Sequence, residues 1–118
     1  MNTFAGRQTE NKTARRLLSF IEEFGKLDPE MQIQQIALFL HVMGKPGVTM
    51  RELEQLTGLS SSSVSRNVSA LSKTHRKGQP GHDLLATVED PMDRRIKRIS
   101  PTPKGTKVFN TLINILGS

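Results

Sequence analysis

Cysteine, tryptophan and tyrosine are all missing from this 118-residue sequence, whose only aromatic rings besides histidine belong to five phenylalanines. Without cysteine the chain cannot form disulfides, bind metal through thiolates or sense redox state through cysteine. His75 and His82 lie in one loop region, but two histidines without cysteine partners do not predict a zinc site. A glycine-rich phosphate loop is also absent, and the many serines lack histidine and aspartate partners. We therefore expect no metal, no cofactor and no enzyme.

Long apolar runs are missing as well. The longest, residues 36–43, is interrupted by His41 and is far too short to span a membrane. The N-terminus lacks the order of charged and apolar residues that marks a signal peptide. We therefore expect a cytoplasmic protein with no membrane partner. Its apolar content of 35 % is low, which suggests helices that bury part of their surface against a second copy of the chain.

Acidic residues are scarce in one stretch, and this sets the charge of the whole chain. From Ser60 to Lys107 there are ten Lys and Arg residues against four Asp and Glu, whereas the remainder carries seven of each, so the net charge of +6 lies entirely in that stretch. Such a footprint favours nucleic acid as a partner. A solubilising surface is the alternative.

The length favours one domain, with a disordered N-terminus over residues 1–10 and one folded domain over residues 11–118. Apolar periodicity and turn residues predict the elements in order: a helix over about 12–24, a helix starting at Asp28-Pro29 and ending near Gly44, two helices within about 49–73, strands over 84–88 and 94–99, and a last helix over about 103–116. Pro101 is expected to break the chain.

The segment of about 49–73 has the pattern of a helix-turn-helix. Thr49 and Glu52 fit a capping box, residues 57–59 form a tight turn, and Ser60 can cap the second helix.

The second helix of this motif separates two faces. Val64, Val68 and Leu71 share one face at helical spacing. The opposite face carries only hydroxyls and cations, with no glutamate between Ser60 and Lys73, and this mixture suits a DNA major groove. An ordinary solvated face is the alternative. The polar positions are Ser62, Arg66, Ser69 and Lys73.

A hairpin over about 84–99 forms the second DNA-binding candidate. Residues 90–93 predict a tight turn, and the basic run 94–98 follows it. A narrow basic tip can enter a minor groove, where arginine is favoured, and Asp93 could hold Arg95 in shape. A charged edge strand that resists aggregation is the alternative, and the two roles are compatible.

The segments Arg51–Arg66, Asp90–Arg95 and Thr102–Gly105 together resemble the MarR family of transcriptional regulators, over about residues 29–105. The resemblance implies a mainly α-helical fold with a small β-hairpin: a winged helix-turn-helix flanked by N- and C-terminal dimerisation helices. It also implies that Arg95 enters the minor groove, oriented by Asp93. The expected DNA-binding residues are Ser61, Ser62, Ser65, Arg66, Ser69, Lys73, Arg76, Lys77, Arg94, Arg95 and Lys97. The expected dimer interface is Leu17, Leu18, Ile21, Phe24, Phe109, Leu112, Ile113 and Leu116.

Three features depart from the family pattern. The loop from Lys73 to Asp83 is enlarged, and Pro101 stands where the family commonly has leucine. The sequence ends soon after the last predicted helix, where the family usually has one more long helix, so we do not expect a small-molecule effector.

We therefore expect a sequence-specific, double-stranded DNA-binding transcriptional regulator, a repressor that binds a pseudo-palindromic operator as a homodimer. A winged-helix module for protein interaction or a replication complex is one alternative. A protein that binds nucleic acid without sequence specificity is another.

Overall fold

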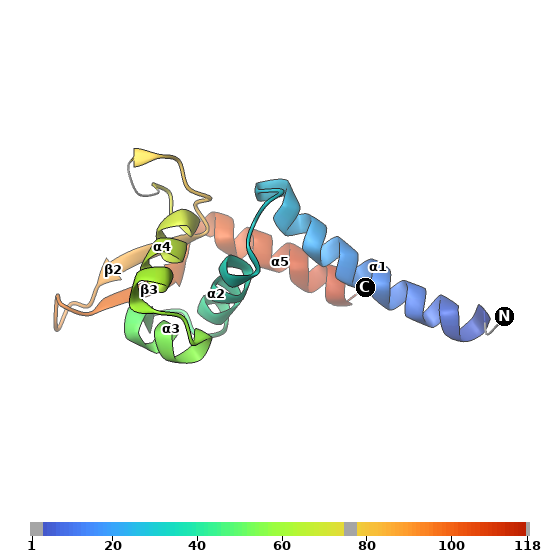
Figure 1. The fold of residues 1–118 in the computed structure, drawn as a ribbon, viewed down its shortest axis with the longest axis horizontal. Coiled ribbons are helices and arrows are strands. Elements are labelled where there is room, and N and C mark those ends of the chain that lie inside the picture. The colour runs from blue at the N-terminus through green and yellow to red at the C-terminus, as the bar shows by residue number, and fades with distance from the viewer. Residues whose placement is uncertain (1–3, 75–77, 118) are drawn as a thin grey trace. The chain divides into compact units, whose positions relative to one another are not determined.

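The computed structural model describes residues 4–74 and 78–117, with side chains described from residue 11 onward. Within them lie five helices and three short strands, so the predicted, mainly helical winged helix-turn-helix with a small hairpin is confirmed (Figure 1). The order is α1 (Phe4–Leu27), α2 (Ile33–Gly44), β1 (Val48–Thr49), α3 (Met50–Thr57), α4 (Ser61–Leu71), β2 (Leu85–Glu89), β3 (Lys97–Pro101) and α5 (Pro103–Gly117). None of the described helices has the length and apolar content to cross a membrane.

The chain divides into two compact units. One combines residues 1–31 with residues 108–118, and the other is residues 32–107.

The core of the unit 32–107 lies around α2, which contacts α3, α4 and β3. Leu38, Phe39 and Val42 of α2 are completely buried, whereas Ile33 at its start is exposed. The remaining core side chains come from the elements around α2: Val48, Leu53, Val64, Val68, Leu71, Leu84, Leu85 and Ile99. This packing fixes the helix-turn-helix and the sheet to one support.

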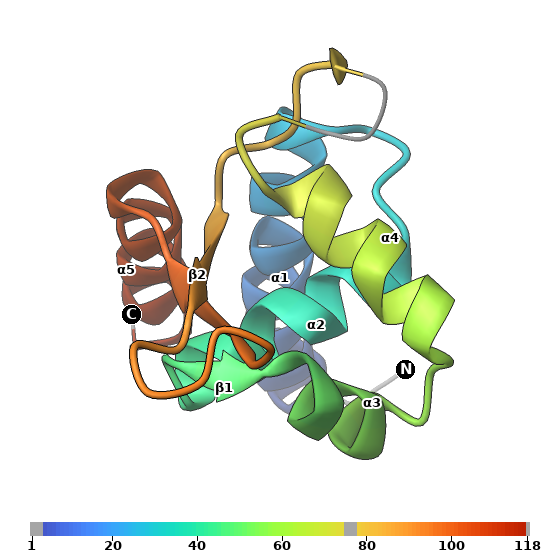
Figure 2. The same ribbon diagram turned by 90° about the vertical axis from the view of Figure 1, so that its left-hand side faces the viewer.

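The sheet has three antiparallel strands in the order β1-β3-β2 (Figure 2). Strand β1, which the sequence analysis did not predict, pairs Val48 with Ile99 and Thr49 with Arg98. Because Thr49 is followed directly by α3, this pairing joins the base of the hairpin to the start of the helix-turn-helix.

Two helices near the N-terminus have other bounds than predicted. Helix α1 spans Phe4–Leu27, so it includes part of the segment expected to be disordered and continues past Gly25. Helix α2 begins at Ile33 and not at Asp28-Pro29. The Asp28 side chain accepts the Glu30 N–H at 2.9 Å, and its carbonyl accepts the Met31 N–H at 3.0 Å, so this segment closes a turn before the helix.

The hairpin strands are also displaced from their predicted bounds. Residues 94–96 belong to the turn and not to the second strand, since the turn is held by carboxylates described below. Pro101 does not break the chain but ends β3, paired with Leu85. A proline has no N–H to donate, and the end of a strand tolerates that loss.

Thr102 starts helix α5 with three hydrogen bonds. Its N–H donates to the Leu84 carbonyl at 3.0 Å, and its hydroxyl donates to the Asp83 carbonyl at 2.6 Å and accepts the Gly105 N–H at 3.0 Å. Pro103 then suits the first helical position. Gly105 lies so close to the neighbouring backbone that a Cβ there would stand 2.1 Å from the Leu84 carbonyl oxygen. The Thr-Pro-x-Gly motif therefore fixes the start of α5 against the residue that precedes β2.

In the unit formed by the chain ends, the apolar residues expected at a dimer interface fall into two groups. Phe24 and Leu112 are buried within the chain, each about 1 % exposed, and Phe109 is half-buried. The exposed members are Leu17, Leu18, Ile21, Ile113 and Leu116, all at least 50 % exposed.

Candidate nucleic-acid interface

The capping box predicted at the start of α3 is present. The Thr49 hydroxyl accepts the Glu52 N–H at 3.1 Å, and the Glu52 carboxylate accepts the Thr49 N–H at 2.9 Å. Lys45 also pairs with this carboxylate. The Lys45 bond, followed by the Thr49 N–H, lowers the pKa of Glu52 from 4.5 to about 2. The first helix of the motif therefore begins at a fixed, ionised cap.

The turn between α3 and α4 also follows the predicted pattern. Gly58 adopts a left-handed conformation with φ of 71°, which glycine adopts without steric cost. Ser60 caps α4 by accepting the Ser63 N–H at 3.2 Å. Thus Thr49, Gly58 and Ser60 together set the geometry of the helix-turn-helix.

Helix α4 buries its predicted apolar face. Val64, Val68 and Leu71 are at most 2 % exposed. The sequence analysis missed Asn67, which is also buried and donates through its side-chain amide to the side-chain oxygen Oε1 of Gln34 in α2 at 3.5 Å. Apolar packing and one polar contact therefore orient α4 on α2.

The positions of α4 that were predicted to bind DNA are exposed, apart from Ser69, which is half-buried. The hydroxyls and cations of this face thus lie on the surface, and no acidic residue occurs in α4. Arg76 and Lys77, also predicted to bind DNA, lie outside the described residues. The exposed predicted positions are Ser61, Ser62, Ser65, Arg66 and Lys73.

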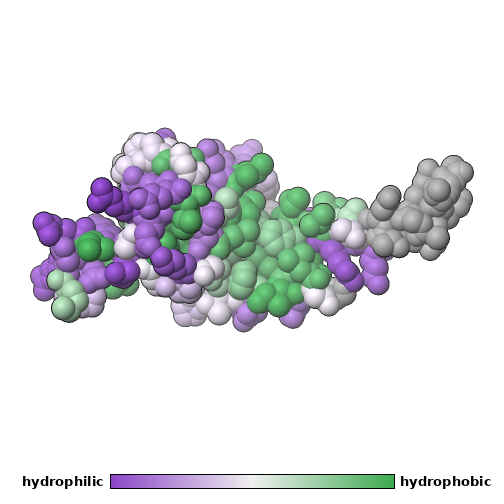
Figure 3. Space-filling model, turned by 90° about the horizontal axis from the view of Figure 1, so that it is seen from below, coloured by the Kyte–Doolittle hydropathy of each residue, from purple (hydrophilic) through white to green (hydrophobic). Residues whose placement is uncertain are grey.

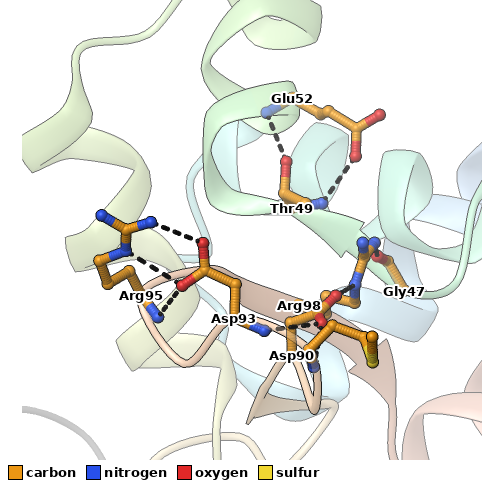
Figure 4. Close-up of polar contacts among 8 residues, drawn as sticks. Gly47, Thr49, Glu52, Asp90, Asp93, Arg95 and Arg98 are labelled. Atoms are coloured by element: carbon orange, nitrogen blue, oxygen red, sulfur yellow. Dashed lines mark hydrogen bonds and ion pairs between the residues drawn. The ribbon is translucent and has the colours of Figure 1, made fainter.

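Two carboxylates shape the wing, which is the hairpin β2–β3 with its turn (Figure 4). Asp90 is buried and accepts the Met92 N–H at 2.7 Å and the Asp93 N–H at 3.3 Å. The backbone closes the same turn, since the Asp90 N–H donates to the Ile96 carbonyl at 2.8 Å. At the tip, the Asp90 carboxylate therefore accepts the N–H groups that strand pairing does not satisfy.

Asp93 holds Arg95 by a two-pronged bond, as the sequence predicted. The Arg95 Nε and Nη2 atoms donate to the two oxygens of Asp93, both at 3.0 Å, and the Arg95 backbone N–H adds a third bond at 3.1 Å. The guanidinium lowers the pKa of the Asp93 carboxyl, and the carboxylate raises the pKa of Arg95. The Arg95 side chain is nevertheless 89 % exposed, so its other N–H groups remain available to a ligand. Arg94 and Lys97 are exposed beside it.

Arg98 is a wing residue that the sequence analysis did not assign. Its Nε donates to Asp90 at 2.5 Å and its Nη1 donates to the Gly47 carbonyl at 2.9 Å (Figure 4). The bond to Arg98 lowers the pKa of Asp90. Gly47 lies 51 positions away in sequence, so no local pattern could have revealed this contact.

Two surface hollows separate the wing from the helix-turn-helix. One, of about 310 Å³, lies between α4 and the wing and is lined mostly by hydroxyls: Met50, Ser65, Val68, Ser69, Ser72, Thr74, Thr87 and Lys97. The other, of about 400 Å³, lies between the start of α3 and the wing and is lined by Thr49, Met50, Arg51, Glu54, Arg95, Ile96 and Lys97. Arg51, which the sequence analysis did not assign, adds an exposed cation here.

The enlarged loop after α4 is fixed at both ends. The carbonyls of Ala70, Leu71, Ser72 and Lys73 accept N–H groups of residues 81–84, at 2.7–3.2 Å. Gly81 permits this approach, since a Cβ there would stand 1.8 Å from the Ser72 carbonyl oxygen. The returning chain therefore satisfies the carbonyls that a helix end leaves without partners.

The described residues form a helix-turn-helix with a basic wing, and comparison with known protein families gives a match to the same motif. Residues 29–74, which contain α2, α3 and α4, match the model of the MarR family. Over these residues the helix-turn-helix is similar to the MarR family. The wing and α5 lie beyond the matched residues, and there the agreement comes from the structure.

Solved structures share the fold of this chain. The PcaV transcriptional regulator from Streptomyces coelicolor, in complex with its natural ligand, is 27 % identical with a TM-score of 0.59, over 89 % of this chain and 70 % of that chain. S. aureus MepR in complex with DNA is 16 % identical with a TM-score of 0.70, over 98 % and 84 %. MarR itself is 19 % identical with a TM-score of 0.64, over 98 % and 77 %. The last two likenesses establish the fold alone.

Among curated proteins, no relative matches the sequence of this chain. Its fold is that of solved MarR-family structures.

Proposed function

We propose that this chain is a sequence-specific, double-stranded DNA-binding transcriptional regulator that acts in the cytoplasm as a repressor. The observation that carries the proposal is Arg95, held by Asp93 at the exposed wing tip of a unit whose recognition helix α4 has an acid-free outer face. The repressor role rests on a steric mechanism, in which the bound protein excludes polymerase from the same DNA.

Each exposed group has a defined task in this proposal. Arg66 and the serines of α4 read base edges in the major groove. Arginine prefers the guanine edge, and a serine hydroxyl can hydrogen-bond to the edge of any base. Arg95 enters the adjacent minor groove, where the negative potential favours a cation. Arg51, Lys73 and Lys97 contact phosphates, which position the protein without reading sequence.

A homodimer belongs to the proposal. Leu17, Leu18 and Ile21 of α1 and Ile113 and Leu116 of α5 are exposed, and Figure 3 shows apolar side chains gathered on the surface where these two helices lie. Soluble monomers seldom leave such a patch uncovered. A two-fold dimer covers it and presents two recognition helices to a pseudo-palindrome, with half-sites about 34 Å apart.

Selection of bound DNA from a random pool, followed by sequencing, tests this function. The expected result is an enriched pseudo-palindrome. Arg95→Ala should weaken binding to that selected sequence by roughly 1–3 kcal/mol, as the loss of one specific contact does, and leave the unfolding midpoint unchanged. Equal binding to random and selected DNA would favour a non-specific nucleic-acid-binding protein, and no binding to either would favour a protein-interaction module.

A further inference from the structure

Asp90 and Arg98 form a polar contact inside the wing that the DNA-reading residues do not explain. The Asp90 side chain is only 10 % exposed, yet it carries a charge and accepts three hydrogen bonds, from Met92, Asp93 and Arg98. Charged groups are seldom buried unless they are paired. The pair therefore has a role in the arrangement of the wing.

The second bond of Arg98 leads out of the wing. Its Nη1 reaches the carbonyl of Gly47, whose own N–H donates to the Ile99 carbonyl at 2.8 Å. Gly47 directly precedes β1, and β1 directly precedes α3. One guanidinium thus joins the turn at the wing tip, through Asp90, to the chain that begins the helix-turn-helix.

We propose that Arg98 is a positioning residue for DNA recognition: by bonding Asp90 and Gly47 together, it fixes the wing tip relative to α3 and so places Arg95 at the minor groove. This inference rests on the proposed function. The Arg98–Asp90 contact holds the turn of the wing, and the Asp93–Arg95 contact holds the side chain that reads DNA. Arg98 acts through Arg95 and needs no contact of its own with DNA.

The two bonds require arginine and not merely a positive charge. Nε and Nη1 lie at fixed separation on one planar guanidinium, whereas lysine presents all its donors from one nitrogen. Arg98→Lys therefore keeps the charge and loses the joint contact. A direct phosphate contact would be largely preserved by this change, because lysine also binds phosphate as a point charge.

A double-mutant cycle with Arg95 tests the proposal on the selected DNA. Arg98→Lys should weaken binding by roughly tenfold in the wild-type background, within the range that coupled residues show. In the Arg95→Ala background the same change should have little further effect, since the residue it positions is absent. The matched control is Lys97→Gln, a charge loss on the same strand, whose effect should be the same in both backgrounds.

A second measurement needs no DNA. Amide hydrogen exchange of Met92 and Asp93, whose N–H groups bond to Asp90, should become faster in Arg98→Lys but not in Lys97→Gln. Wild-type affinity in Arg98→Lys, or equal losses in the two Arg95 backgrounds, would overturn the positioning role. If no variant and no wild-type protein binds DNA specifically, the proposed function fails, while the exchange rates still decide whether Arg98 holds the wing.

Discussion

Arg66 decides whether the exposed face of α4 reads bases or only holds phosphate. It is exposed on a helix whose other outward side chains are mostly serines. Arg66→Ala should relax base preference at one position of each half-site, at a cost of about 1–3 kcal/mol for the preferred base. Repeating the random-pool selection with the variant measures this directly.

Arg51→Ala provides the matched control, since Arg51 lies at the start of α3 beside the wing hollow. It should weaken binding to all sequences alike, leave the selected motif unchanged and flatten the slope of log affinity against log salt by about 0.9. If Arg66→Ala behaves in the same way as this control, Arg66 contacts phosphate and not a base.

Local spacing explains which site residues could be predicted from the sequence. Asp93 and Arg95 are two positions apart in a turn, so their pairing followed from the motif alone. Arg98 bonds to a carbonyl 51 positions away, and Asn67 to a side chain 33 positions away. Those partners are brought together only by the fold, because the antiparallel pairing of β1 with β3 carries Gly47 to Arg98.

At the level of elements, Gly105 tests why the Thr-Pro-x-Gly motif starts α5 where it does. A Cβ at this position would stand 2.1 Å from the Leu84 carbonyl oxygen. Both atoms are attached to the backbone, so a side-chain rotation cannot relieve the clash. Gly105→Ala should destabilise the fold by about 1–3 kcal/mol, the usual cost of overpacking. Urea unfolding followed by circular dichroism measures the change.

Gly44→Ala is the matched control for this prediction. Nothing lies within 4 Å of a Cβ at Gly44, which ends α2. Reduced freedom of the unfolded chain should then stabilise the variant by up to about 1 kcal/mol. Equal stability of the two variants would mean that the approach of Gly105 to Leu84 relaxes without cost.

The cap of α3 predicts a specific loss of stability in acid. Glu52 has a pKa of about 2 in the folded protein against an ordinary value of 4.5, so its ionised form is favoured by folding. Its contribution is complete above about pH 4.5 and is lost as the pH falls toward 2. Glu52→Gln keeps an acceptor for the Thr49 N–H but cannot titrate.

The variant should therefore lose less of its thermal unfolding midpoint between pH 5 and pH 2 than the wild type does. The measurement is a series of thermal unfolding curves across that pH range. Glu30→Gln, which removes an exposed carboxyl outside the cap, is the comparison. If both variants follow the same pH course, the Lys45–Glu52 pair does not act on stability as described.

An element was predictable where its local sequence fits only one structure. It was not predictable where the same residues fit two. Thr49 and Glu52 can satisfy each other only at a helix start, and that prediction was confirmed. Asp28 can either cap a helix or close a turn, and the structure uses it for the turn. Strand β1 has two residues and exists only through its pairing with β3, so its own sequence could not reveal it.

At the scale of the whole molecule, helical periodicity predicted the apolar stripe of the terminal helices. It could not separate the residues buried within the chain from those left exposed. Phe24 and Leu18 belong to the same predicted helix, yet Phe24 is 1 % exposed and Leu18 is 54 % exposed. Burial within the chain and burial against a second copy produce the same pattern in sequence. Substitution of the buried Leu112 would therefore test folding, and the proposed dimer must be tested at exposed positions.

Helix α1 supplies the exposed positions needed to test how the proposed dimer pairs. Ala14, Leu17, Leu18 and Ile21 follow the spacing of one helical stripe and are exposed. Arg15 and Glu22 are also exposed and lie seven positions apart, on the same flank of that stripe. When two such helices pack antiparallel about a two-fold axis, equal flanks face each other. If the two-fold axis lies level with the middle of the segment 15–22, Arg15 faces the partner's Glu22 and the partner's Arg15 faces Glu22.

Charge reversal tests this arrangement. Arg15→Glu or Glu22→Arg alone should weaken dimerisation by on the order of tenfold, because each turns two modest attractions into repulsions. The double variant should regain wild-type affinity, since the pairs are restored with their signs exchanged. Sedimentation equilibrium measures all three, and Leu18→Asp is the control that should give a monomer. A wild-type mass of 13.1 kDa at micromolar concentration would rule out the dimer, whereas a dimer unaffected by both single reversals would place its interface away from this flank of α1.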